Sequence, residues 1–292
     1  AASSDGEYRG VAPDASILNI KVLDKRGRAP DFWVARGIVE AMRVGADVIN
    51  LSLGGPGHPD DLLSRLVNLA ASRGHVVVAA AGNSGPGRGT IESPGVAAHA
   101  ITVGATDKRK RVTEYSSRGP VDGMMKPEIV APGGDRGQEI VASRPPDVEP
   151  LCLPVGKCYM GCIGTSMAAP HVSGAVALLL EAMGGRRQDS PFVVKKILME
   201  TAEDLGEPRE AQGAGFLRVD KAVEKARGQT AAPAASPGLP LALLGAVASI
   251  LMGVGVLAEA ARRAAGDRVS LLSQMYREGK ITLAQLVEMY RR

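Results

Sequence analysis

The first two-thirds of the sequence alternates short apolar segments, rich in β-branched residues, with segments of helical periodicity. We expect strands at residues 15–23, 46–53, 75–81 and 100–104, and helices at residues 31–45, with Asp31 as the cap, and 60–73. This alternation predicts a parallel sheet with right-handed crossovers and helices on both faces. The expected fold class is therefore α/β, with ligands bound beyond the carboxyl ends of the strands.

Glycine-rich segments follow two of these expected strands. Ser52, Leu53, Gly54 and Gly55 end the second strand, and the segment 82–85 ends the third. Either segment alone is most simply a turn. At neighbouring strand ends, the two together indicate one cleft.

A third segment places a serine on a tight glycine turn directly before an apolar helix expected at residues 172–183. Ser166 follows Gly164 and Thr165 there. Such a turn exposes the serine hydroxyl, and the free N–H groups of the helix start favour a developing anion. The alternative is a serine that only caps the helix.

Charge and cysteine content exclude several classes of function. The formal net charge of +4 is too small to indicate nucleic-acid binding, and no basic run alternates with aromatic residues. Cys152, Cys158 and Cys162 are an odd number, so they form at most one internal disulfide. No histidine or fourth cysteine lies nearby to complete a metal site. One disulfide with a free thiol, or three free thiols, are the readings left open.

Several motifs in a fixed order resemble those of the subtilisin-like serine proteases. The nucleophile motif is GTSMAAPHV at residues 164–172, the substrate-strand motif is VINLSLGG at 48–55, and the oxyanion motif is AAAGN at 79–83. Further landmarks of the family lie at residues 10–13, 115–120, 126–128, 131–133 and 213–217. The resemblance covers roughly residues 10 to 226 and implies the subtilisin-like α/β fold.

The resemblance implies a role for each matching residue. Ser166 would be the nucleophile, and Asn83 would stabilise the oxyanion together with the N–H of Ser166. The remaining matched residues would bind an extended peptide or protein substrate, as an added strand and as the walls of its pocket: Ser52, Leu53, Gly54, Ala80, Ala81, Gly82, Gly164 and Thr165. No cofactor is required, and a structural calcium ion is compatible with the family but has no site that we can place.

A serine hydroxyl needs a histidine base and an aspartate that orients it. In this family both precede the serine, and here both are expected upstream of Gly10, where the nine residues hold no histidine. Asp5 is too close to Gly10 to serve. We expect His75, His99 and His171 to be structural and give His58 little weight as a base. The chain alone is therefore expected to be inactive, and the alternative is a non-catalytic, peptide-binding membrane receptor.

Glu92 bears on substrate choice. The segment 91–95 aligns on Pro94 with the base of the family's specificity pocket, where glycine is common in place of Glu92. A carboxylate there would favour lysine or arginine before the cut. The alternative is a Glu92 side chain that turns outward into solvent. Ile163 also departs from the family, which commonly has asparagine there.

The last third of the chain differs from a protease domain. We expect the peptidase domain at residues 1–226, a linker at 227–238, a transmembrane helix at 239–258 and a helical tail at 259–292. The alternative for the span is a buried core helix. The tail holds seven Lys/Arg against four Asp/Glu, which favours a cytoplasmic tail and a peptidase domain outside the cell membrane. Small residues at Gly245, Ser249 and Gly253 would allow self-association of the span.

Overall fold

The computed structural model describes residues 7–144, 149–150 and 152–230. The chain divides into the units Ala1–Pro233 and Ala234–Arg292, and all described residues belong to the first. Its helices are α1 Asp31–Arg43, α2 Leu62–Ser72, α3 Thr165–Ala182, α4 Ser190–Thr201, α5 Arg209–Gln212 and α6 Val219–Thr230. Its strands are β1 Val48–Leu51, β2 Val76–Ala80, β3 Ile101–Thr106, β4 Ile129–Pro132, β5 Ile140–Ser143, β6 Leu153–Val155 and β7 Tyr159–Cys162.

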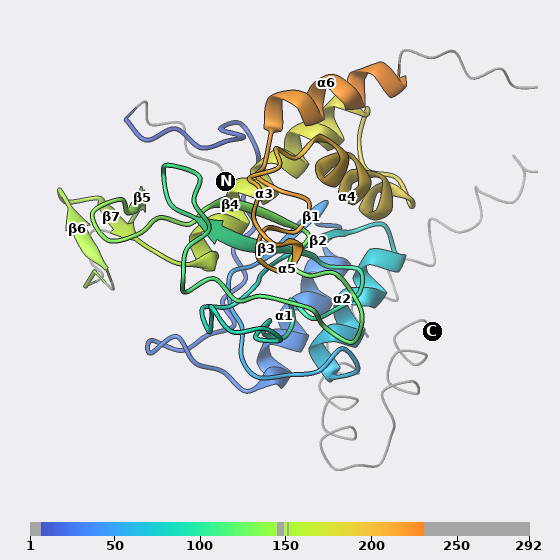
Figure 1. The fold of residues 1–292 in the computed structure, drawn as a ribbon. Helices are drawn as coiled ribbons and strands as arrows, with labels where there is room; N and C mark the ends of the chain where they lie inside the picture. The colour runs from blue at the N-terminus through green and yellow to red at the C-terminus, as the bar shows by residue number, and fades with distance from the viewer. Residues whose placement is uncertain (1–6, 145–148, 151, 231–292) are drawn as a thin grey trace, which may run out of the picture. The chain divides into compact units, whose positions relative to one another are not determined.

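The central sheet is parallel, with the strand order β1-β2-β3-β4 (Figure 1). Val48 pairs with Val76, Val78 with Ile101, and Val103 with Ile129. Three of the four strands expected from the sequence are present, within a few residues of their expected ends. Because all strands run the same way, the segments after β1 and β2 emerge at the same end of the sheet, where the strands have their carboxyl ends.

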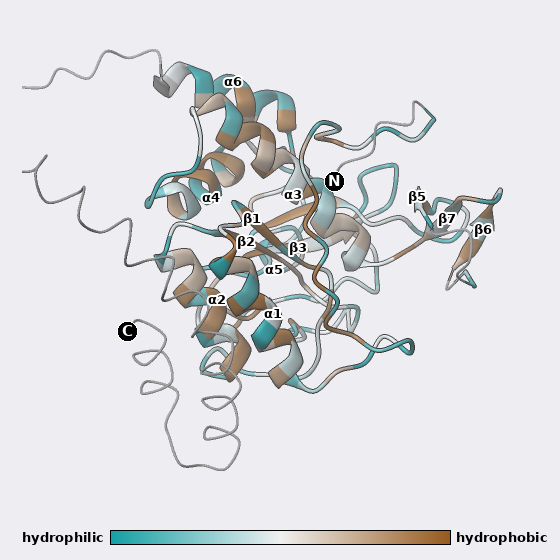
Figure 2. Ribbon diagram, turned by 180° about the vertical axis from the view of Figure 1, so that it is seen from behind, coloured by the Kyte–Doolittle hydropathy of each residue, from teal (hydrophilic) through white to brown (hydrophobic). Residues whose placement is uncertain are grey.

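Side chains of this sheet alternate between two apolar cores. On β2, Val76, Val78 and Ala80 pack with α3, α4 and α6, whereas Val77 and Ala79 pack with α1 and α2. Every residue of β2 is buried, as the apolar run predicted. Figure 2 shows the apolar residues on the strands and on the helix faces that cover them. The expected arrangement of helices on both faces is confirmed.

The expected strand at residues 15–23 is wrong. No strand forms there, and Ile17 and Leu18 are exposed. A cavity of about 1170 Å³ separates this segment from β1, the edge strand of the sheet. A strand needs a hydrogen-bonded neighbour, and with this cavity between them the segment does not pair with β1. Val22 instead packs against α1, at a point where Gly37 leaves room for it.

A second, antiparallel sheet of order β5-β7-β6 precedes the helix that carries Ser166. A disulfide joins Cys152 to Cys162, across the start of β6 and the end of β7, and Cys158 is a free, exposed thiol. Of the two readings that the sequence left open, the structure therefore has one disulfide with a free thiol. The bridge fastens the hairpin at its base, two residues before Gly164.

Two helix boundaries and one cap differ from expectation. Helix α3 begins at Thr165 rather than near Val172, and α6 continues to Thr230, so the first residues of the expected linker are helical. The residue before α1 is Pro30, and Asp31 is its first helical residue rather than its cap. The expected span at 239–258 and the tail lie outside the described residues. Within the described part of the chain, every helix is too short or too polar to cross a bilayer.

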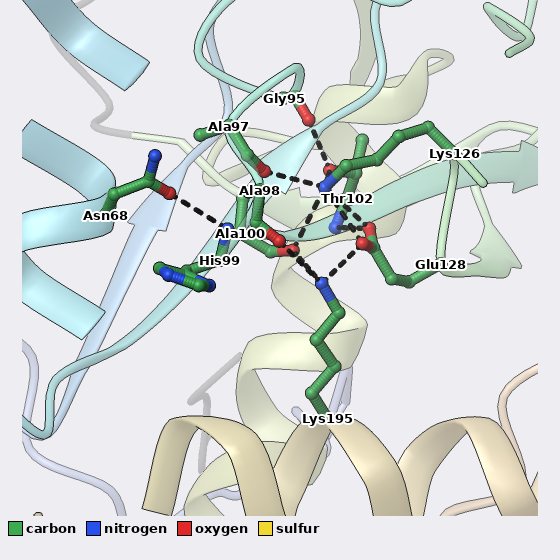
Figure 3. Close-up of polar contacts among 10 residues, drawn as sticks. All are labelled: Asn68, Gly95, Ala97, Ala98, His99, Ala100, Thr102, Lys126, Glu128 and Lys195. Atoms are coloured by element: carbon green, nitrogen blue, oxygen red, sulfur yellow. Dashed lines mark hydrogen bonds and ion pairs between the residues drawn. The ribbon is translucent and has the colours of Figure 1, made fainter. Parts of the chain in front are cut away.

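A buried charge cluster fixes the loop that leads into β3 (Figure 3). The Lys126 ammonium donates to the carbonyls of Ala97 and Ala100 at 2.8 and 3.2 Å, and it lies 2.9 Å from the Glu128 carboxylate. Lys195 of α4 reaches the same carboxylate at 2.5 Å. Both Lys126 and Glu128 are almost fully buried. The cluster thereby holds the loop and α4 against the sheet.

Burial lowers the pKa of the Lys126 amine from 10.5 to about 8. Between pH 8 and 10.5 the Lys126 amine holds its proton in the unfolded chain and loses it in the folded protein. The free energy of unfolding therefore rises with pH across this range, and this gain is lost as pH falls through 8. We expect the free energy of unfolding of the wild type to rise by about 1–3 kcal/mol between pH 8 and 10.5, relative to Lys126→Met. Urea titrations of both proteins across this range measure the difference. Parallel pH profiles would contradict the assignment.

Candidate active site

Ser166 lies in the first turn of α3, directly after a conformation that only glycine adopts readily. Gly164 precedes the helix with φ 143° and ψ 163°. Its N–H donates to the carbonyl of Gly133 at 2.9 Å, which ties the turn to the end of β4. The cap is therefore Gly164, and the reading of Ser166 as a capping residue is wrong. The N–H of Ser166 is one of those at the helix start that have no partner within the helix.

Pro170 explains how Ser166 is fixed to the strand end. A proline at this position lacks the N–H that would bond the carbonyl of Ser166 one turn earlier. That carbonyl instead accepts a hydrogen bond from the Ser52 hydroxyl at 2.8 Å. The side chain of Asn50 in turn donates to the Ser52 hydroxyl at 2.9 Å. The segment after β1 is thus joined directly to the helix start.

The Ser166 hydroxyl donates to the main-chain carbonyl of Ser52 at 3.2 Å. In the part of the chain that the structure describes, no imidazole accepts its proton. The Ser166 residue is half-buried.

Asn83 follows β2 and its amide is oriented by Thr165. The amide oxygen accepts from the N–H and the hydroxyl of Thr165, at 3.0 and 3.1 Å. The Thr165 hydroxyl also accepts from the N–H of Gly82 at 3.2 Å. With its oxygen engaged, the amide NH₂ of Asn83 is left beside Gly164, and among the described residues no acceptor takes its protons. This arrangement suits a donor aimed at an anion.

The other predicted substrate residues flank this pair. Ala80 ends β2, and Ala81 donates to the carbonyl of Val103 at 2.9 Å. Leu53 packs on the core between the sheet, α1 and α2. Gly54 and Gly82, on the two strand ends, both lie against the side chain of Glu92. The structure therefore brings all the predicted site residues to the carboxyl end of the sheet.

The four histidines have other partners. The ring of His171 contacts the carbonyl of Met167 within its own helix, and burial lowers its pKa. His75 contacts the carbonyl of Ala46, and His99 packs on Phe192. His58 is exposed and lies 3.3 Å from the Asp122 carboxylate.

Two contributors to the site were not singled out from the sequence. Pro170 could have been recognised, because a proline four residues after Ser166 leaves the serine carbonyl without its helical donor. Ser84 donates to the Glu92 carboxylate at 2.7 Å, and no sequence pattern indicates that contact.

Comparison with known proteins agrees with this geometry. The model of the subtilase family matches residues 1–216, which is more than half of the chain. The chain belongs to the subtilase family. Serine protease AprX of Bacillus subtilis is 37% identical over 248 residues, which cover 76% of the chain and 54% of AprX. Subtilisin Savinase of Lederbergia lenta is 37% identical over 217 residues, which cover 73% and 70%. Pyrolysin of Pyrococcus furiosus is 36% identical over 259 residues, which cover 74% of the chain and 18% of pyrolysin.

Solved structures of the same kind share the fold. A lanthipeptide protease matches with a TM-score of 0.63 and 26% identity, covering 74% of this chain and 72% of that one. The patellamide maturation protease PatA matches with a TM-score of 0.62 and 29% identity, covering 77% and 79%. The expected subtilisin-like α/β fold is confirmed. The chain spans only about half the length of AprX, so the activity of the whole protein is treated as a proposal below.

Replacing Asn83 by alanine tests the amide donor. If the amide donates to the oxyanion and not to the bound peptide, kcat should fall by about 10²–10³ with KM nearly unchanged. This magnitude is the one known for subtilisin, a member of this family. Steady-state kinetics of the product of the complete reading frame on a peptide substrate measure the change. A rise in KM by the same factor, with kcat unchanged, would show that Asn83 binds substrate instead.

Proposed function

We propose that this chain carries the nucleophile of a serine endopeptidase that hydrolyses proteins or peptides by acyl transfer. The observation that carries the proposal is the pairing of Ser166 at the start of α3 with an asparagine amide whose oxygen is already engaged by Thr165. The protease names of the family relatives support it.

The reaction would proceed in two steps. The Ser166 hydroxyl attacks the scissile carbonyl, loses its proton to a base, and forms a tetrahedral oxyanion. The Asn83 amide and the N–H of Ser166 donate to that oxyanion. Collapse expels the amine with the proton that the base returns, and water then hydrolyses the acyl-enzyme in the same way.

Among the described residues around Ser166, none supplies the base that this reaction needs. A histidine oriented by an aspartate is the base that this chemistry uses. We propose that these two groups come from protein outside the sequence printed here, and that the 292-residue chain is inactive by itself.

A second function is a membrane receptor that binds peptides without cutting them. The hydrogen bond from the Ser166 hydroxyl to the Ser52 carbonyl favours it, because a hydroxyl engaged there is not activated. The free Asn83 amide favours the enzyme, since a receptor has no oxyanion to stabilise.

Peptide hydrolysis distinguishes these functions. The 292-residue chain and the product of the complete reading frame are each incubated with a quenched-fluorescent peptide library, and cleavage sites are mapped by mass spectrometry. The proposal expects cleavage by the latter product and none by the chain alone. Peptide binding without cleavage by either protein would support the receptor.

We also propose, from the sequence, that residues 239–258 anchor the protein in the cell membrane, with the peptidase outside and the tail in the cytoplasm. The absence of charge over twenty residues and the basic tail support this. The full chain should remain in the membrane pellet after carbonate extraction, and a chain lacking residues 239–258 should be released. Release of both would refute the anchor.

A further inference from the structure

Glu92 is held between the two strand ends that flank Ser166. Its N–H donates to the carbonyl of Ala81 at 2.9 Å, just beyond β2. The next residue, Ser93, pairs with Gly55 beyond β1 through two main-chain hydrogen bonds of 2.9 and 3.1 Å. The main chain at Glu92 therefore bridges the ends of β1 and β2.

The Glu92 side chain fills the space that two glycines leave open. A Cβ atom on Gly82 would lie 2.6 Å from the Glu92 carboxyl carbon, and one on Gly54 would lie 2.9 Å from the Glu92 Oε2. A larger residue at either position would force the Glu92 side chain to move. The Glu92 residue is half-buried, and its side chain lies against both strand ends.

This space adjoins the reactive pair. Gly82 donates to the Thr165 hydroxyl, next to Ser166 in the chain, and Ser52, two residues before Gly54, exchanges hydrogen bonds with Ser166. Glu92 and Ser166 therefore contact the same two strand ends, the segments that follow β1 and β2. A substrate side chain that enters between the two strand ends meets Glu92.

The carboxylate lacks a cationic partner. Its Oε1 accepts a hydrogen bond from the Ser84 hydroxyl at 2.7 Å, and the Ser84 N–H is itself fixed by Ser117 at 3.0 Å. Within the described residues, no lysine, arginine or histidine pairs with Glu92 and no donor reaches Oε2. Glu128 differs, since it is paired with two lysines. A half-buried carboxylate with one neutral donor has capacity left for a cation.

We propose that Glu92, positioned by Ser84, selects substrates with lysine or arginine as the residue before the cut. The inference rests on the proposed function, because it takes Ser166 as the point of cleavage. The arginine guanidinium or lysine ammonium would donate to Oε2, while Oε1 stays on Ser84. Because Glu92 lies against both strand ends, bulky apolar side chains would be excluded from the space between them.

Binding to the full chain tests the inference without requiring catalysis. Fluorescein-labelled Ala-Ala-Ala-Arg is compared with Ala-Ala-Ala-citrulline, which has nearly the same shape but no charge, by fluorescence anisotropy. We expect the arginine peptide to bind about 10- to 100-fold more tightly, as for a hydrogen bond between charged groups. Glu92→Gln should abolish the difference. Glu207→Gln, an exposed site with the same change in net charge, should preserve it.

Each outcome has a separate meaning. Equal binding of the two peptides to the wild type, or an arginine preference that survives in Glu92→Gln, would overturn the role of Glu92 and leave the proposed function standing. Failure of every peptide to bind, together with no cleavage by the product of the complete reading frame, would overturn the proposed function itself. A Glu92→Gly variant that gains binding of Ala-Ala-Ala-Phe would further support the exclusion of bulky side chains by Glu92.

Discussion

Replacing Ser166 by alanine in the product of the complete reading frame should lower kcat/KM for a peptide substrate by at least about 10⁴-fold. The Ser166 hydroxyl is the proposed nucleophile at the start of α3, whereas the neighbouring Thr165 hydroxyl is engaged by both Gly82 and Asn83. Removing it leaves the oxyanion donors and the peptide-binding residues in place. The loss should therefore appear in kcat, with KM changed by only a few-fold.

Ser173→Ala is the matched control for this variant. Ser173 lies two turns further along the same helix, is buried, and its hydroxyl donates to Asn50 at 2.8 Å. Its loss should cost stability of about 1 kcal/mol and less than tenfold in kcat/KM. A Ser166→Ala protein that keeps a tenth or more of the activity would show that another residue is the nucleophile.

Replacing Glu128 by glutamine should destabilise the fold by about 3–5 kcal/mol. Glu128 is the one carboxylate between Lys126 and Lys195, and its Oε2 also accepts from the N–H of Thr102 at 2.8 Å. Without its charge, two ammonium groups are left together in a buried site, where desolvation is not repaid. Urea unfolding followed by circular dichroism measures the change as a lower midpoint at an unchanged slope.

The exposed pair of Glu200 and Lys225, 2.8 Å apart, provides the comparison. Glu200→Gln removes the same charge from the same domain and should cost less than about 1 kcal/mol, because water solvates both partners. If Glu128→Gln and Glu200→Gln lowered the free energy of unfolding equally, burial of the cluster in Figure 3 would have no energetic consequence.

The part of the fold set by local pattern was predictable. The apolar run at residues 75–81 required a strand buried on both faces, and β2 is that strand. The glycine before Ser166 indicated a turn at a helix start, and Gly164 makes it with a positive φ. In both cases the residue types themselves determine the conformation.

Features that depend on distant partners could not be predicted in this way. The β-branched residues at 15–23 have the pattern of a strand, but a strand forms only beside another, and the cavity next to β1 separates the two. The direction of the Glu92 side chain depends on glycines nearly forty and ten residues earlier, and on the Ser84 hydroxyl. Sequence alone could state two readings of Glu92 and could not choose between them.

The measurement that tests the central claim most directly is covalent labelling of Ser166. The product of the complete reading frame is treated with a fluorophosphonate, which forms a bond only with an activated serine, and the labelled residue is mapped by tandem mass spectrometry. The account predicts a phosphonate on the Ser166 oxygen, slower labelling in Asn83→Ala, and none in Ser166→Ala. A folded protein that binds peptides yet leaves Ser166 unlabelled would contradict it and establish a peptide-binding receptor in its place.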